Sequence, residues 1–127
     1  RMDALALLIA IGLAAGPAAA QQRVTIVDGD TVRWQGRLVR IAGLDTPELR
    51  GSRCPAERLK AERARDRLAE LLARGAIIEA AEGRDRYGRL LANVRTRSGR
   101  NVADILVAEG LAVPYHGRGP RQNWCTP

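Results

Sequence analysis

Two short segments gather acidic residues near the start of an otherwise basic chain. Residues 28–31 read DGDT and residues 40–48 read RIAGLDTPE, which together hold four carboxylates and one arginine. Hydrolysis of a phosphodiester needs cationic groups to neutralise charge on the phosphoryl oxygens and a base to activate water. Residues 85–89, DRYGR, add two more arginines and a tyrosine. The pattern therefore indicates a cation held beside phosphate.

The composition favours one small domain with a polyanionic partner. The chain has 127 residues, 46% of them hydrophobic, which is enough for a single modest core. Its net charge is +7, and Lys60 is the only lysine, so nearly all the positive charge is arginine. Arginine matches phosphate geometry bidentately, which favours a polyanion as partner. A genome-wide bias toward arginine and alanine would give the same composition.

The first twenty residues are typical of a secretory signal. Residues 5–15 form a continuous apolar run, and Gly16-Pro17 and the small residues 18–20 follow it. This pattern predicts a signal peptide over residues 1–20 and a folded domain over residues 21–127. A retained membrane anchor is the alternative, although the run is shorter than the ~20 residues that span a bilayer. We expect a periplasmic or secreted monomer that leaves the membrane after cleavage.

Expected export bears on the state of the two cysteines. In an oxidising compartment Cys54 and Cys125 can form a disulfide that ties the C-terminal tail to the start of a helix. Closing so long a loop would contribute about 4 kcal/mol in the chain-entropy model. Two unpaired thiols are the alternative. A zinc site is not expected, because the cysteines lack histidine or acidic neighbours at ligand spacing.

The order of predicted elements is strand-rich. Residues 23–42 hold three groups of β-branched residues separated by turn residues, which predicts a three-stranded meander. Residues 55–75 predict an amphipathic helix with Pro55 in its first turn. Two further strands are predicted over residues 77–80 and 90–94, and a second helix runs from an Asn101 cap to a stop at Gly110. The fold class is α+β, mainly β: a five-stranded Greek-key barrel of the OB-fold kind with two or three helices.

Four segments together resemble the thermonuclease (staphylococcal nuclease-like) family. They are residues 27–32, residues 40–48, residues 85–89 and residues 101–115, in that order along the chain. Each alone has an ordinary explanation: a hairpin turn, a proline turn or a solvated loop with a surface ion pair. Their joint occurrence in the family's order and spacing carries the resemblance, which covers about residues 24–115.

The resemblance implies a calcium site. Asp30 and Asp45 would supply carboxylate oxygens to Ca²⁺, and the main-chain carbonyl of Thr46 would supply a third ligand. Hard oxygen donors suit this cation, and so few protein ligands leave positions for water and a substrate phosphate. Asp28 would be an outer acid that steadies the metal region.

The resemblance also implies the groups that act on the substrate. Glu48 would be the general base for the attacking water, and Arg40 and Arg89 would bind the reacting phosphate and stabilise the transition state. A separate set would bind the nucleotide, and its members are Tyr87, Tyr115 and Arg86. Partly buried tyrosines at the rim of the core are the alternative for both tyrosines.

Three departures from the family pattern affect these expectations. Residues 48–55 are shorter than the family's substrate loop, Arg86 replaces a lysine, and the long C-terminal helix has no counterpart. We interpret a bridge between Cys54 and Cys125 as a substitute anchor for the tail.

The sequence thus predicts an exported, Ca²⁺-dependent nuclease that hydrolyses DNA and RNA and leaves 3′-phosphate and 5′-hydroxyl ends. A nucleic-acid-binding module without cleavage and a calcium-sequestering protein are the alternatives. The sequence leaves open the preference between DNA and RNA, the metal used in the cell, and endo- against exonucleolytic cleavage.

Overall fold

The computed structural model describes residues 23–126, so the predicted signal segment lies outside the described residues. Strands β1 (Thr25–Asp28), β2 (Thr31–Trp34) and β3 (Arg37–Ile41) pair antiparallel in sequence, which confirms the predicted meander. The turn from β2 to β3 is made by Gln35 and Gly36, both at positive φ (50° and 74°). Turns of this hand match the twist of the strands they join.

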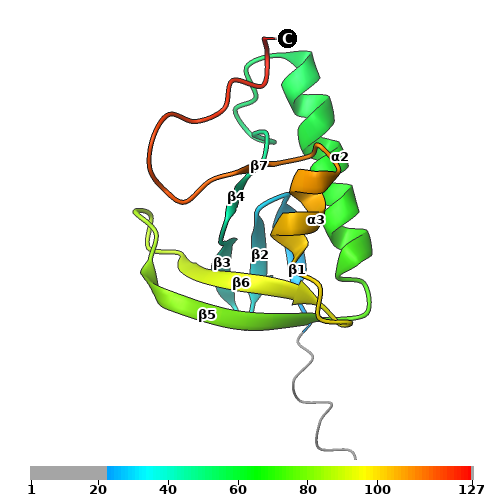
Figure 1. Ribbon diagram of the computed structural model, residues 1–127, viewed down its shortest axis with the longest axis vertical. Coiled ribbons are helices and arrows are strands. Elements are labelled where there is room, and N and C mark those ends of the chain that lie inside the picture. The colour runs from blue at the N-terminus through cyan, green and yellow to red at the C-terminus, as the bar shows by residue number, and fades with distance from the viewer. Residues whose placement is uncertain (1–22, 127) are drawn as a thin grey trace, which may run out of the picture.

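The remaining long strands extend the meander into a five-stranded sheet. Strand β6 (Leu90–Thr96) lies parallel to β3, and β5 (Ala76–Arg84) pairs antiparallel with β6. The resulting order is β1-β2-β3-β6-β5, and Figure 1 shows β5 and β6 curving across the lower side of the sheet. This topology confirms the OB-fold-like class. The predicted barrel is nevertheless not closed, since no ladder joins the two edge strands, β1 and β5, in the described residues.

A second, two-stranded sheet was not predicted. Strand β4 (Leu44–Asp45) pairs antiparallel with β7 (Val113–Pro114), and the backbone N–H of Tyr115 donates to the carbonyl of Gly43 at 3.1 Å. Each strand is two residues long, so neither has enough residues to show a period in the sequence. The pairing brings the chain that follows β7 to the exit of β3.

Both predicted helices form. Helix α2 (Pro55–Leu71) begins after a Cys54 N-cap. It ends before the expected Gly75, and the residues up to that glycine form a turn in which the Gly75 N–H donates to the Leu72 carbonyl at 3.0 Å. Helix α3 (Val102–Ala108) is capped as predicted by Asn101, whose side chain accepts from the N–H groups of residues 103 and 104. Across residues 23–126, neither helix combines the length and the apolar character that a membrane crossing requires.

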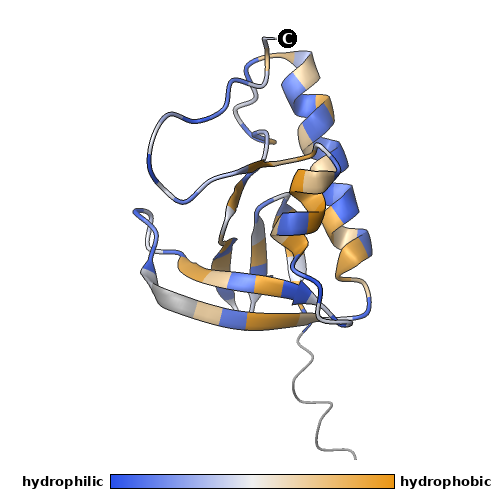
Figure 2. Cartoon of the chain, viewed as in Figure 1, coloured by the Kyte–Doolittle hydropathy of each residue, from blue (hydrophilic) through white to orange (hydrophobic). Residues whose placement is uncertain are grey.

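The core lies between the sheet and the two helices. Figure 2 shows hydrophobic bands alternating with hydrophilic ones along β5 and β6 and an apolar stripe on α3. The largest fully buried apolar side chains come from the strands and from both helices: Ile41, Leu44, Leu68, Leu106, Val32, Val39, Val94 and Val102. Burial of each contributes about 1.5 to 3 kcal/mol. This core fixes β3 and the turn before β2, which carry the acidic and basic residues of interest.

Candidate active site

The turn between β1 and β2 carries Asp30 and is shaped by close packing. Asp28 Oδ1 accepts a hydrogen bond from the backbone N–H of Asp30 at 3.2 Å, and the turn packs against α2. A Cβ atom on Gly29 would lie 2.8 Å from the Cβ of Ala64 and 3.0 Å from Cγ2 of Thr46. Real Cβ atoms do not approach that closely, so glycine is needed for this contact.

Arg40, on β3, is buried between two acids. Its guanidinium donates to the carbonyls of Ile41 (2.7 Å) and Leu44 (3.0 Å). Its Nη2 also lies 3.4 Å from Asp30 Oδ2 and 3.7 Å from Asp45 Oδ1. Fixed carbonyls and carboxylates therefore hold the guanidinium in one orientation, as a preorganised phosphate site requires.

The pKa values of the two turn acids move in opposite directions. Burial disfavours the charged form of Asp30, but the Arg40 guanidinium and the surrounding hydrogen bonds outweigh it, so its pKa is lowered. Burial and then the negative charge of Asp30 raise the pKa of Asp28 to about 7. One negative charge of this pair is thus held firmly, at the position nearer to Arg40.

Asp45, on β4, is 1% exposed and only partly satisfied. Its Oδ1 forms an ion pair with Arg121 from the C-terminal tail. Its Oδ2 is buried and accepts no hydrogen bond within residues 23–126. Thr46, which follows it, is also buried. A buried carboxylate oxygen without a donor is costly unless a cation or water satisfies it.

Glu48 is exposed, while its backbone is anchored. The N–H of Glu48 donates to Glu57 Oε2 at 3.1 Å, and the N–H of Arg53 donates to Glu57 Oε1 at 2.7 Å. Glu57 is buried in the first turn of α2, so it holds both ends of the connecting loop. Glu48 Oε1 lies 3.4 Å from Arg121 Nη2. Partial burial and the charge of Asp30 raise the pKa of Glu48, and Arg121 opposes them.

Arg89 is positioned by the turn before β6. Asp85 Oδ1 accepts from the N–H groups of Tyr87 (3.0 Å) and Arg89 (2.8 Å), and Asp85 Oδ2 pairs with Arg89 Nε at 2.5 Å. Arg89 Nη1 then donates to the hydroxyl of Thr31 at 3.2 Å. The DRYGR segment is therefore a structured turn that aims one arginine at β2.

The predicted reacting residues form one continuous network. Its links run through successive hydrogen bonds and ion pairs of the described chain, in this order: Arg89, Thr31, Asp30, Arg40, Asp45, Arg121 and Glu48. The structure thus brings together the three expected catalytic side chains and the two carboxylates expected to bind metal. Their roles remain predictions.

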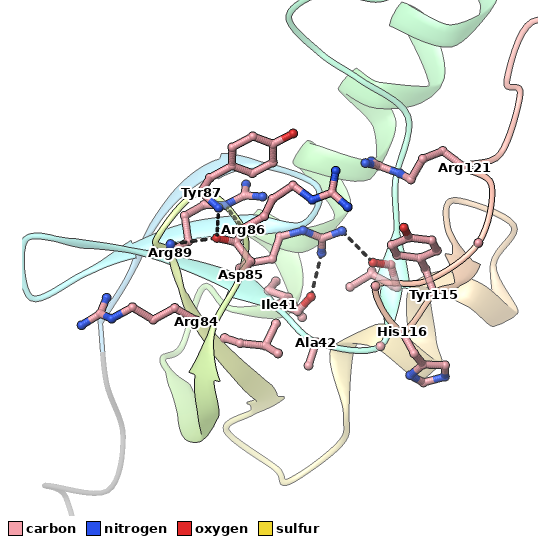
Figure 3. Close-up of a pocket in the computed structure, with 16 residues that line it drawn as sticks. Ile41, Ala42, Arg84, Asp85, Arg86, Tyr87, Arg89, Tyr115, His116 and Arg121 are labelled. Carbon is pink, nitrogen blue, oxygen red and sulfur yellow. Dashed lines mark hydrogen bonds and ion pairs between the residues drawn. The ribbon is translucent and has the colours of Figure 1, made fainter.

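A pocket of about 590 Å³ opens beside this network. Its lining includes all the predicted phosphate- and nucleotide-binding residues: Arg40, Arg86, Tyr87, Arg89 and Tyr115, together with Arg84, His116 and Arg121. Figure 3 shows the pocket between the turn at residues 85–89 on one side and the C-terminal tail on the other. Tyr87 is 73% exposed and carries the Arg89 guanidinium 5.5 Å from its ring centre, so neither partner is a core residue. Five arginines make this a pocket for anions.

The expected calcium ligands fit a hard cation. In the part of the chain that the structure describes, no three His, Cys, Asp or Glu side chains gather as a metal cage. The predicted set needs only two carboxylates, Asp30 and Asp45, with the carbonyl of Thr46. The unpartnered Asp45 Oδ2 is an oxygen that such a cation would satisfy.

The predicted disulfide is present. Cys54 and Cys125 are bonded, with their Cα atoms 6.0 Å apart. The bridge returns the end of the tail to the start of α2, as Figure 1 shows. Two functional candidates were not predicted: Glu57, which falls within the predicted helix over residues 55–75, and Arg121. The one available signal for Arg121 was its place four residues before a cysteine expected to be bridged.

Comparisons with known proteins agree with this geometry. The family described as "Staphylococcal nuclease homologue" matches residues 38–124. The chain is also 35% identical to Protein ParB of Escherichia coli, in an alignment covering 87% of this chain and 68% of that protein. Members of the matched family are generally nuclease hydrolases that act on or bind nucleic acids and typically depend on Ca²⁺. The match confirms the resemblance found in the sequence motifs, and the chain belongs to the staphylococcal nuclease homologue family.

Proposed function

We propose that the protein is a Ca²⁺-dependent nuclease that hydrolyses DNA and RNA phosphodiesters, leaving 3′-phosphate and 5′-hydroxyl ends. The observation that carries this proposal is the network joining Arg40 and Arg89 to Asp30, Asp45 and Glu48. Both arginines line the pocket, and the three acids form ion pairs with Arg40 or Arg121, which line it as well. A module that only bound nucleic acid would need the arginines but not this set of acids.

The two arginines divide the work on the phosphate. Arg40 presents a fixed guanidinium from β3, and Arg89 presents one from the opposite turn. Both donate to the nonbridging phosphoryl oxygens, and they donate more strongly as charge builds there in the transition state. Removing one such donor costs about 10²- to 10³-fold in rate in other enzymes.

Glu48 acts as the base. It takes a proton from water while the water oxygen attacks phosphorus in line, the bond from phosphorus to the 5′-oxygen breaks, and the leaving oxygen takes a proton from solvent. Asp30, Asp45 and the Thr46 carbonyl would hold Ca²⁺, which when bound supplies positive charge beside the phosphoryl oxygens. Tyr87 and Tyr115, which line the pocket, pack against the base and sugar.

The same proposal includes export to the periplasm or the medium. The Cys54–Cys125 bridge supports this location, because disulfides persist in oxidising compartments. The N-terminal apolar run supports it as well.

Digestion of end-labelled single-stranded DNA and RNA by the full chain tests the activity. We expect cleavage with Ca²⁺, none with EGTA, and product ends that kinase and phosphatase treatment identify as 3′-phosphate and 5′-hydroxyl. Arg40→Ala, Arg89→Ala and Glu48→Gln should each slow cleavage by about 10² or more. Arg37→Ala, at an exposed position of β3, is the matched control. Cleavage that is undiminished in Arg40→Ala would refute the proposal.

A further inference from the structure

The C-terminal tail places an arginine in the site from outside the five-stranded sheet. After β7 the chain runs alongside the pocket as an irregular loop and returns to α2 at the disulfide (Figure 1). Two tail arginines, Arg118 and Arg121, lie on this loop. Only Arg121 lines the pocket, whereas Arg118 is exposed and does not. The tail is therefore fixed at both ends with one cation directed inward.

The guanidinium of Arg121 is only partly used by the protein. Its Nη2 serves both Asp45 and Glu48, and its carbon centre lies 5.3 Å from the ring centre of Tyr115. Within residues 23–126 its hydrogen bonds to the two acids run through Nη2, and 47% of the side chain is exposed. A guanidinium has five N–H donors in a rigid fork, so donors remain for a ligand.

The position of these donors suits a second phosphate. Figure 3 shows Arg121 pointing from the tail toward the pocket that Arg86 and Tyr115 also line. A nucleic-acid strand carries one phosphate per nucleotide, so a strand bound at Arg40 and Arg89 presents a neighbouring phosphate along the pocket. The Tyr115 ring supports the flat face of the guanidinium, which limits its rotation.

We propose that Arg121 is a substrate-positioning residue that binds a phosphate next to the reacting one, and that the Cys54–Cys125 bridge holds it in place. This inference rests on the proposed function, because it assumes that a nucleic acid occupies the pocket. It concerns binding rather than chemistry. Loss of Arg121 should weaken affinity for a strand even when no cleavage takes place.

Fluorescence anisotropy with a labelled single-stranded oligonucleotide in EGTA reads this binding without turnover. We expect Arg121→Ala to weaken binding about tenfold and to lower the slope of log affinity against log salt by about one. Arg121→Lys should recover part of the affinity, because it keeps the charge but not the fork. Arg118→Ala, on the same tail, should bind as the wild type does. In Ca²⁺, Arg121→Ala should raise KM more than it lowers kcat.

One further variant separates direct contact from a change of local charge. If Arg121 served only as a counter-ion to Asp45 and Glu48, adding Asp45→Asn and Glu48→Gln to Arg121→Ala would restore affinity in EGTA. Direct contact predicts that the combined variant stays weak. Restored affinity, or an Arg121→Ala variant that binds like the wild type, would overturn the inference. A wild type that binds DNA but does not cleave it would instead contradict the proposed function and leave this inference standing.

Discussion

Arg89 and Thr31 lie 58 residues apart in the chain and meet in a hydrogen bond of 3.2 Å. The Thr31 hydroxyl accepts from Arg89 and donates its own proton to Asp30 Oδ1 at 3.0 Å. One hydroxyl can do both at once. Thr31 therefore joins an arginine expected to bind phosphate to an acid expected to bind metal.

Thr31→Val tests the importance of this link. Valine keeps the shape of the buried side chain but leaves Asp30 without one donor and Arg89 without one anchor. We expect kcat/KM for single-stranded DNA to fall about tenfold, and the free energy of unfolding to fall by about 1 to 3 kcal/mol. Thr25→Val, at an exposed position of β1, is the control. Unchanged kinetics would mean that the Asp85 contacts alone position Arg89.

Asp85 makes stability depend on pH in the acid range. Burial opposes its ionisation, but hydrogen bonds from the backbone and the guanidinium of Arg89 outweigh burial and lower its pKa. A carboxyl whose pKa is lowered by folding stabilises the protein fully above its unfolded pKa, about 3.9. That contribution is lost as pH falls through the lower, folded value.

Asp85→Asn should therefore lower the free energy of unfolding at pH 6, relative to the wild type. The difference between the two proteins should become smaller below about pH 4. Urea unfolding of both proteins from pH 6 to pH 2 measures the difference. Asp66→Asn, an exposed change on α2, is the control. A deficit that stays constant across this range would show that Asp85 does not titrate differently in the folded and unfolded protein.

The acids and Arg40 and Arg89 were selected as site residues because their segments together match the family's motifs, while the turns and caps beside them follow from local patterns. Asp30 lies in a two-residue turn between β-branched groups, and Asn101 caps its helix as expected. Such signals depend on neighbours in the chain. The fold class followed from the order of the predicted elements, five strands with a helix after the third, rather than from any one segment.

Two other features that depend on distant pairing were not predicted. The β4 and β7 pairing involves two residues on each side, and Arg121 reaches Asp45 across 76 positions. Apart from its place four residues before Cys125, nothing near Arg121 in the sequence distinguishes it from the chain's other arginines. The position of Arg121 beside Asp45 depends on the path of the tail, which the short β4–β7 sheet and the disulfide fix.

The disulfide should contribute stability that can be measured separately from helix capping. Cys54 is also the N-cap of α2, where its sulfur accepts from the N–H of Glu57 at 3.4 Å. Serine is a good N-cap, so Cys54→Ser with Cys125→Ser removes the bridge and keeps the cap. With the cysteines 71 positions apart, the chain-entropy relation predicts a loss of about 4 kcal/mol.

Urea unfolding of the double serine variant and of the wild type in reducing agent checks this prediction, since both should lose about the same stability. The double variant should also show the weakened oligonucleotide binding expected of Arg121→Ala. A variant that lost stability but kept full affinity would show that the tail holds Arg121 without the bridge.

Gly29→Ala should disturb the fold at the contact between α2 and the Asp30 turn. The added methyl group would meet the Ala64 Cβ at 2.8 Å and Thr46 Cγ2 at 3.0 Å. The Ala64 Cβ is fixed to the helix backbone, so α2 or the turn must move. We expect a loss of about 1 to 3 kcal/mol of stability and weaker Ca²⁺ binding, because Asp30 and Thr46 would shift apart.

Ala64→Gly removes the nearest obstruction and so provides the matched test. Alone it should cost about 1 kcal/mol, because glycine weakens a helix interior. Combined with Gly29→Ala, it should recover part of the loss, so the double variant is more stable than the sum of the single changes predicts. Recovery should remain incomplete, because Thr46 still lies 3.0 Å from the new methyl group. Urea unfolding of the four proteins measures the coupling, and single-variant losses that add within about 0.5 kcal/mol would show that the helix contact is not what requires glycine.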